Sequence, residues 1–177
     1  MPTAARSHLV ARSITSAMFD APSPALVWTG DGVRADRWGR LHCARHAMDA
    51  RARAISASET ACASVTKLLV IQILRPQSHA DVRDWLVSCR DDDVGPETIA
   101  AVVADVQRGL SASEELMVGY DPRRGRARLL WPWGGRTDVY DEPFMRAIWR
   151  AYFTTSDQPE LGEQLLRWSA HVAARSS

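Results

Sequence analysis

The stretch that decides the fold is Leu116–Leu166, LMVGYDPRRGRARLLWPWGGRTDVYDEPFMRAIWRAYFTTSDQPELGEQLL. Two short apolar runs flank a turn that contains Pro122 and Gly125, and Gly134-Gly135 marks a second turn directly afterwards. Turn residues between apolar runs of strand length predict a β-hairpin. An amphipathic helix then opens at Asp141-Glu142-Pro143, and a last helix begins near Glu160. The apolar face of the first helix consists of Phe144, Met145, Ile148, Trp149, Tyr152 and Phe153.

A sheet covered by helices is the architecture that this stretch favours. Four of the seven tryptophans fall in the C-terminal third, namely Trp131, Trp133, Trp149 and Trp168. A layer of helices on an antiparallel sheet is the natural way to bury that much aromatic surface.

The upstream half supplies more strands and two helices. Lys67–Leu74 is the clearest strand, and it is apolar on both faces, so we expect both faces to be covered at least in part. Ser78 followed by Asp81 predicts a capped helix start, and Pro96 predicts another. Weaker expectations are a strand over Ala25–Thr29, a tight turn at Gly30-Asp31-Gly32, a strand over Val33–Ala47, an edge strand over Arg51–Ser56, one helical turn over Glu59–Ser64 and a helical extension through Ser111–Glu114. The order of elements predicts an α+β fold with an antiparallel sheet.

Composition limits the possible classes of partner. The chain has 177 residues, a net charge of +1 and a pI of about 7.8, so its overall charge favours neither nucleic acid nor an acidic membrane as partner. We expect an N-terminal extension over residues 1–24, a single domain over 25–172 and a tail over 173–177. No run approaches the roughly 18 apolar residues of a membrane span. The chain therefore reads as soluble and cytoplasmic, or periplasmic if an export signal has been trimmed.

Two groups of residues suggest specific sites: a metal site and a nucleic-acid patch. His42, Cys43 and His46 could begin a metal site, but a site needs three or four ligands and no second cluster is evident, so we expect neither metal nor cofactor. The arginine run from Arg123 to Arg128 resembles a nucleic-acid patch. It lies on a hairpin tip, where solvated charge is normal, so we expect no nucleic-acid partner. The sequence does not indicate a protein partner.

The order of these landmarks resembles the chalcone isomerase-like proteins, most closely their bacterial branch. Gly30-Asp31-Gly32-Val33-Arg34 resembles that family's Gly-x-Gly-x-Arg motif. The other matching landmarks are Leu68–Arg75 with Ser78–Leu86, the hairpin Met117–Leu130, and the endings Phe144–Tyr152 and Gln158–Leu166. The resemblance spans about Ala25 to Leu166. It implies an open-faced sandwich, in which helices cover one face of a large antiparallel sheet and a ligand cleft lies between the two layers.

The resemblance also assigns chemistry, and the chain departs from it. Catalytic members close a phenolate oxygen onto an enone, and the resemblance gives Arg34 the role of stabilising the developing negative charge. His42 stands near the place of a catalytic threonine, or of a tyrosine in bacterial relatives. Trp85 stands near the place of a catalytic tyrosine, and Asp91 or Asp92 near that of an asparagine. The chain contains no asparagine, so the donor network of the enzymes is not reproduced.

Three hypotheses remain open. The first is a non-catalytic binder of a small apolar or amphipathic acid, either a fatty acid or an aromatic acid, with Arg34 at the polar end and Trp85 and Tyr152 along the apolar part. The second is an isomerase, an intramolecular lyase of the chalcone–flavanone type, with Arg34 as electrophile and His42 as general base. The third is a structural or partner-binding protein whose cleft is filled by its own side chains.

Overall fold

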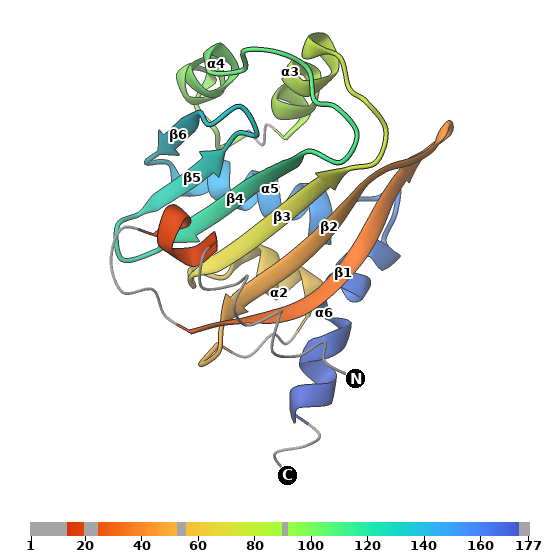
Figure 1. Cartoon of the computed structure of the whole chain (residues 1–177). Coiled ribbons are helices and arrows are strands. Elements are labelled where there is room, and N and C mark those ends of the chain that lie inside the picture. The colour runs from red at the N-terminus through yellow and green to blue at the C-terminus, as the bar shows by residue number, and fades with distance from the viewer. Residues whose placement is uncertain (1–13, 20–24, 53–55, 90–91, 174–177) are drawn as a thin grey trace.

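A single antiparallel sheet organises the computed structural model, which describes residues 14–19, 25–52, 56–89 and 92–173. The six strands follow one another in sequence order across the sheet (Figure 1). The strands are β1 (Leu26–Asp36), β2 (Gly39–Asp49), β3 (Lys67–Ile73), β4 (Glu115–Asp121), β5 (Arg126–Leu130) and β6 (Arg136–Val139). The helices are α2 (Ala57–Cys62), α3 (His79–Ser88), α4 (Pro96–Ala104), α5 (Glu142–Phe153) and α6 (Glu160–Ala173). The α+β prediction is therefore confirmed.

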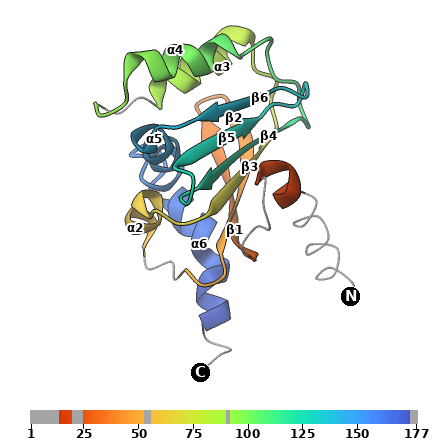
Figure 2. The ribbon, with the colours of Figure 1, turned by 90° about the vertical axis from the view of Figure 1, so that its left-hand side faces the viewer.

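Helices α2, α5 and α6 lie along one face of the sheet, which we call the inner face, and α3 and α4 lie across its upper end (Figure 2). The inward side chains of alternating strand positions, such as Leu69 and Ile71 on β3 and Val118 on β4, join the main core. Helix α5 supplies the other side of that core, with Ile148 and Trp149 fully buried. All six residues predicted for the apolar face of α5 are buried.

A short N-terminal segment covers part of the opposite, outer face. Residues 14–18 form a helical turn, and Met18 and Phe19 pack against a second core that includes Leu68 and Val70 of β3. A Cβ on Gly119 would lie 2.3 Å from the Met18 Cγ, so glycine is needed there for the segment to pack closely. The prediction that β3 is covered on both faces is confirmed.

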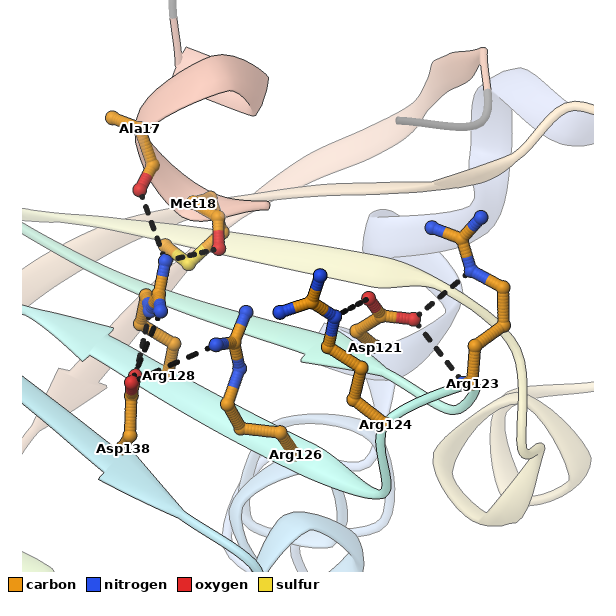
Figure 3. A network of polar contacts seen from close by, with 8 residues as sticks. All are labelled: Ala17, Met18, Asp121, Arg123, Arg124, Arg126, Arg128 and Asp138. Atoms are coloured by element: carbon orange, nitrogen blue, oxygen red, sulfur yellow. Dashed lines mark hydrogen bonds and ion pairs between the residues drawn. The ribbon is translucent and has the colours of Figure 1, made fainter. Parts of the chain in front are cut away.

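The hairpin arginines lie among carboxylates on this outer face (Figure 3). Arg128 is only 2 % exposed, and its Nε donates to Asp138 at 2.6 Å. Its Nη1 also donates to the backbone carbonyl of Met18 at 3.1 Å, which ties the N-terminal turn to the sheet. The remaining arginines of the run each lie within 4 Å of an aspartate oxygen: Arg123 and Arg124 of Asp121, and Arg126 of Asp138. These arginines hold the outer face together.

The helix starts agree with the sequence signals. Ser78 and Asp81 form a reciprocal capping box at α3, and Pro96 is the first residue of α4. Asp141 accepts a hydrogen bond from the Phe144 N–H at the start of α5. The side-chain caps of α3 and α5 satisfy backbone donors that the first helical turn leaves without partners.

The expected turn at Gly30-Asp31-Gly32 is wrong, because these residues lie inside β1. The actual turn comes later, between β1 and β2, where Gly39 has a φ of +112°. Glycine at position 30 is required by packing. A Cβ there would lie 2.3 Å from the Gln164 carbonyl oxygen of α6, so the missing side chain lets the helix backbone rest directly on the strand.

Three other expectations need correction. The single strand predicted over Val33–Ala47 is split between β1 and β2 by their turn. Of the edge strand predicted over Arg51–Ser56, residues 51 and 52 lie in a turn and Ser56 caps α2, while residues 53–55 lie outside the described part. Ser111–Glu114 forms a turn with Ser113 at a φ of +72°, and it does not extend α4. The helical turn expected near Glu59–Ser64 is confirmed as α2.

Candidate functional site

A cavity of about 250 Å³ lies between the inner face of the sheet and helix α3. Its buried floor is mostly aliphatic, with Ile71, Ile73, Leu110 and Leu116. Its rim is polar and carries Asp36, Trp38, Arg75, Asp81 and Asp84; the side chain of Trp38 is 69 % exposed. The remaining lining residues are Leu41, His42, Pro76, Gln77, Trp85 and Tyr152. The cavity therefore has an apolar interior and a charged rim.

A buried histidine–tyrosine pair lines this space. The Tyr152 hydroxyl lies 3.1 Å from His42 Nε2, and both side chains are nearly inaccessible to solvent. Burial, reinforced by the nearby charge of Arg34, lowers the pKa of His42 to about 3, so its imidazole is neutral near pH 7. Burial likewise raises the pKa of Tyr152, so its hydroxyl keeps its proton. Which of the two donates in this hydrogen bond depends on which ring nitrogen of His42 carries the proton.

Two buried ring nitrogens of cavity-lining residues lack a hydrogen-bond partner within the described part of the chain. One is the Nδ1 of His42 and the other is the indole Nε1 of Trp85. A buried polar group without a partner is uncommon in folded proteins and points to a water or a ligand atom. Both residues line the cavity, while these two nitrogen atoms are buried within its wall.

Arg34 lies close to this pair but outside the cavity lining. It stands directly opposite His42 in the β1–β2 register, on the inner face. Its Nη1 donates to the Ala151 carbonyl at 2.7 Å, and its guanidinium lies 5.8 Å from the centre of the Tyr152 ring. A cation suits the last turn of a helix, where backbone carbonyls lack partners. In this structure Arg34 therefore anchors the end of α5.

Arg75 is the cation that does line the cavity. It follows β3 and forms a two-pronged ion pair with Asp36, with one N–O distance of 3.0 Å. The pairing lowers the pKa of the Asp36 carboxyl, so both groups are charged at neutral pH. The resemblance names Arg75 only as the end of a landmark, because its place at the rim depends on the turn between β1 and β2.

The structure does not bring His42, Cys43 and His46 together as ligands of one metal ion. The structure places His42 against Tyr152, whereas His46 bonds the Thr29 hydroxyl at 2.6 Å and packs edge-on against Phe153. Cys43 points to the opposite face, since alternate strand residues do so. No group of three or more metal-ligating side chains occurs in the described ranges. Asp91 lies outside those ranges, and Asp92 is exposed in the loop after α3 and does not line the cavity.

The arrangement is better suited to holding a molecule than to proton transfer. A histidine whose pKa is about 3 takes up protons poorly near pH 7. Arg34 directs a donor at a backbone carbonyl, away from the site of any developing charge. Of the four predicted site residues, His42, Trp85 and Tyr152 line one cavity, and Arg34 is not among its lining residues. Separately, none of the helices in the described residues is long and apolar enough to span a bilayer.

Comparison with known proteins identifies the fold. No family model matches the sequence, and no curated protein sequence matches it. The structure is similar to the crystal structure of a fatty-acid binding protein from Arabidopsis thaliana, with a TM-score of 0.67 and 13 % sequence identity over 87 % of this chain and 94 % of that chain. At that identity the likeness concerns the fold alone. The chain therefore has the chalcone isomerase-like fold that its sequence resembles.

Proposed function

We propose that this protein is a non-catalytic binder of a small apolar or amphipathic molecule, held in the cavity between the sheet and α3. The observation that supports the proposal is an open cavity with an aliphatic floor and a polar rim. Binding sites for small molecules commonly combine an apolar lining with a few placed polar groups. The similar Arabidopsis protein, described as a fatty-acid binding protein, makes a fatty acid or an aromatic acid a reasonable ligand class.

Cavity size favours a compact ligand. A volume of about 250 Å³ lies just under the usual range of about 300–1,000 Å³ for small-molecule sites. One aromatic ring with a short side chain, or a short fatty chain, suits this space better than a long acyl chain. In such a complex Trp85 and Tyr152 would lie along the ligand, and Arg75 would replace Arg34 as the nearest cation of the lining.

The other two hypotheses have less support. An isomerase would need a cation directed at the reacting oxygen, whereas Arg34 bonds the Ala151 carbonyl. A purely structural protein would fill its cleft, whereas this cleft retains about 250 Å³.

Titration calorimetry with octanoate and with cinnamate tests the proposal, together with native mass spectrometry of the purified protein. Leu110→Trp adds bulk inside the cavity and should weaken binding at least tenfold. Val87→Phe adds bulk on the exposed side of α3 and is the matched control, expected to bind as the parent does. Absence of binding by every probe, or equal binding by parent and Leu110→Trp, would contradict the proposal.

A further inference from the structure

We infer that the tip of the β1–β2 hairpin, residues 36–40, docks on the surface of an anionic lipid bilayer. This hairpin projects beyond the end of β3 (Figure 1). A Cβ on Gly39, in the turn between the two strands, would meet no atom within 4 Å, so the space around the tip is open. The tip can therefore meet a large, flat surface without a clash.

Trp38 supplies the apolar part of this tip. Its side chain is 69 % exposed, and the guanidinium of Arg37 lies 4.0 Å from the centre of its ring. Tryptophan has an apolar body and a polar N–H, and it is enriched where lipid chains meet head groups. An exposed indole at the end of a projecting hairpin is therefore placed to enter that layer.

Two arginines give the tip an excess of positive charge. Arg37 and Arg40 are both exposed, and neither forms an ion pair with a carboxylate in the described part of the chain. Asp36, the single acidic residue of the tip, is already paired with Arg75. A guanidinium that stacks on an aromatic ring keeps its N–H edges free to bond phosphate oxygens. The tip thus complements an anionic head-group surface.

The tip is also held in position before it meets a partner. The Asp36 Oδ1 accepts the Trp38 N–H at 2.9 Å and an Arg75 N–H at 3.0 Å, which joins the turn to the end of β3. The Arg75 guanidinium lies 6.0 Å from the centre of the Trp38 ring. Groups that are already ordered lose less conformational entropy on binding.

The attraction is local, because the whole chain carries a net charge of only +1. Asp81 and Asp84 of α3 also line the cavity, and an anionic surface would repel both carboxylates. In about 0.1 M salt, exposed charges act over roughly 10 Å, so those nearest the surface decide the orientation. The protein should therefore dock with the hairpin tip first and α3 directed away.

Docking in this orientation has a consequence for the cavity. Trp38 belongs to the cavity lining, so a docked tip brings the opening of the cavity close to the bilayer, from which an apolar ligand can enter. This consequence rests on the proposed function, whereas docking itself does not. Vesicle binding without ligand would leave the docking inference standing, and ligand binding without vesicle binding would leave the proposed function standing.

Co-sedimentation of the full chain with lipid vesicles tests the docking. Vesicles of phosphatidylcholine alone are compared with an equal mixture of phosphatidylcholine and phosphatidylglycerol, without added ligand. The mixed vesicles should bind the protein about tenfold more tightly, because two arginines lie near the surface. Equal affinity for the two kinds of vesicle would overturn the inference, and so would binding to neither.

Trp38→Ser removes the indole from a turn that is open to solvent, so the fold should be unaffected. Binding to the mixed vesicles should weaken about tenfold. Tyr140→Ser is the matched control, because that side chain is 71 % exposed after β6, at the other edge of the sheet. An equal loss in both variants would mean that the hairpin tip is not the docking surface.

The double variant Arg37→Gln with Arg40→Gln tests the charge. Each substitution should weaken binding to the mixed vesicles about fivefold, and neither should change binding to phosphatidylcholine. Arg51→Gln with Arg136→Gln is the control. It changes the net charge equally at two exposed arginines, one beyond the far end of β2 and one on β6. Equal losses in the two double variants would show that binding follows overall charge, which would overturn the inference.

Quenching of tryptophan emission by lipids with brominated chains locates the contact. Brominated mixed vesicles should quench part of the parent's emission, and Trp38→Ser should lose that quenching even at lipid concentrations that saturate binding. Quenching that persists in the variant would mean that a different tryptophan enters the bilayer, and it would contradict docking through the hairpin tip.

Discussion

His42 and His46 lie four residues apart on β2, both buried on the inner face, and adjacent α5 residues contact them. His42 meets Tyr152 beside an open cavity, whereas His46 meets Phe153 in a closed core. The same strand and the same helix therefore border an open cavity at one end and solid packing at the other. What differs is the element that completes each end.

The closed end is completed by α6. Glycine at position 30 lets the α6 backbone approach β1, and Gly162 would place a Cβ 2.3 Å from the Phe153 carbonyl oxygen. The Thr29 hydroxyl donates to the Leu165 carbonyl at 2.7 Å, which joins strand, histidine and helix. At the open end α3 stands over the sheet and leaves space. The distance between helix and sheet, which small residues set, therefore decides whether a buried histidine lies next to a cavity.

The largest expected effect is a loss of stability in mild acid. In the unfolded chain each histidine takes a proton near pH 6.5, but in the folded chain the pKa of both His42 and His46 is lowered to about 3. The unfolded state therefore binds more protons below pH 6.5. Stability is complete above that pH and falls as the pH decreases, by about 4 kcal/mol between pH 7 and pH 5 for the two groups.

Urea unfolding at several pH values measures this loss. The His46→Gln variant should lose only about half as much stability over the same interval, because one titrating group is gone. A parent whose unfolding free energy stays constant from pH 7 to pH 5 would refute the claim that both ends hold neutral, buried histidines.

The next largest effect concerns the contact that closes one end. Gly30→Ala should cost about 3 kcal/mol, because its Cβ would meet the rigid α6 backbone at 2.3 Å. Gly32→Ala on the same strand should cost only about 1 kcal/mol, because its Cβ meets side-chain atoms of Leu161 and Gln164 that can move. Equal losses in denaturant unfolding would show that backbone approach does not define the closed end.

A smaller effect compares the two hydroxyl groups. Thr29→Val keeps the shape of the side chain but removes the partner of both His46 Nδ1 and the Leu165 carbonyl, at a cost of about 2–3 kcal/mol. Tyr152→Phe removes the partner of His42 next to a cavity that can admit water, so its cost should be about 1 kcal/mol. Thermal and urea unfolding of both variants would show which one loses more stability. A larger loss for Tyr152→Phe would contradict the contrast between the open end and the closed end.

The smallest effect is expected when bulk is added to the open end. Leu110→Trp should change the unfolding free energy by less than about 1 kcal/mol, because the cavity can receive the larger ring. Leu165→Trp, in the closed core, should cost about 3 kcal/mol from overpacking. If both variants lose the same stability in urea, the cavity is not a space that the folded protein keeps open.

Local sequence signals were sufficient for most of the fold. Ser78 with Asp81, Pro96 and Asp141 marked three helix starts correctly, since caps depend on residues within one turn. The apolar pattern of β3 predicted coverage on both faces, which Met18 and Phe19 provide from the outer side. The glycine pair at positions 30 and 32 was misread as a turn, because sequence cannot distinguish a glycine needed for φ from one needed for close approach.

The candidate site was only partly predictable. His42, Trp85 and Tyr152 were named from the resemblance, and they do meet in one cavity. The resemblance assigned Arg34 to the ligand, a role that its charge suits, yet its partner is a carbonyl 117 positions away in sequence. Arg75 received no such role, since its pairing with Asp36 spans 39 positions and depends on how β1 turns into β2.

By itself, the sequence determined the clearest elements: the β3 strand, the helix starts at Ser78, Pro96 and Asp141, and an antiparallel sheet that carries a helical layer. Those properties follow from periodicity, caps and turn residues, which act over a few positions. Only the tertiary structure decided that α6 closes one end while α3 leaves the other open. It also decided that Arg34 bonds a carbonyl at the end of α5, and that the cavity rim is acidic. These depend on distances between elements remote in sequence, set by side-chain volume and charge once the layers have packed.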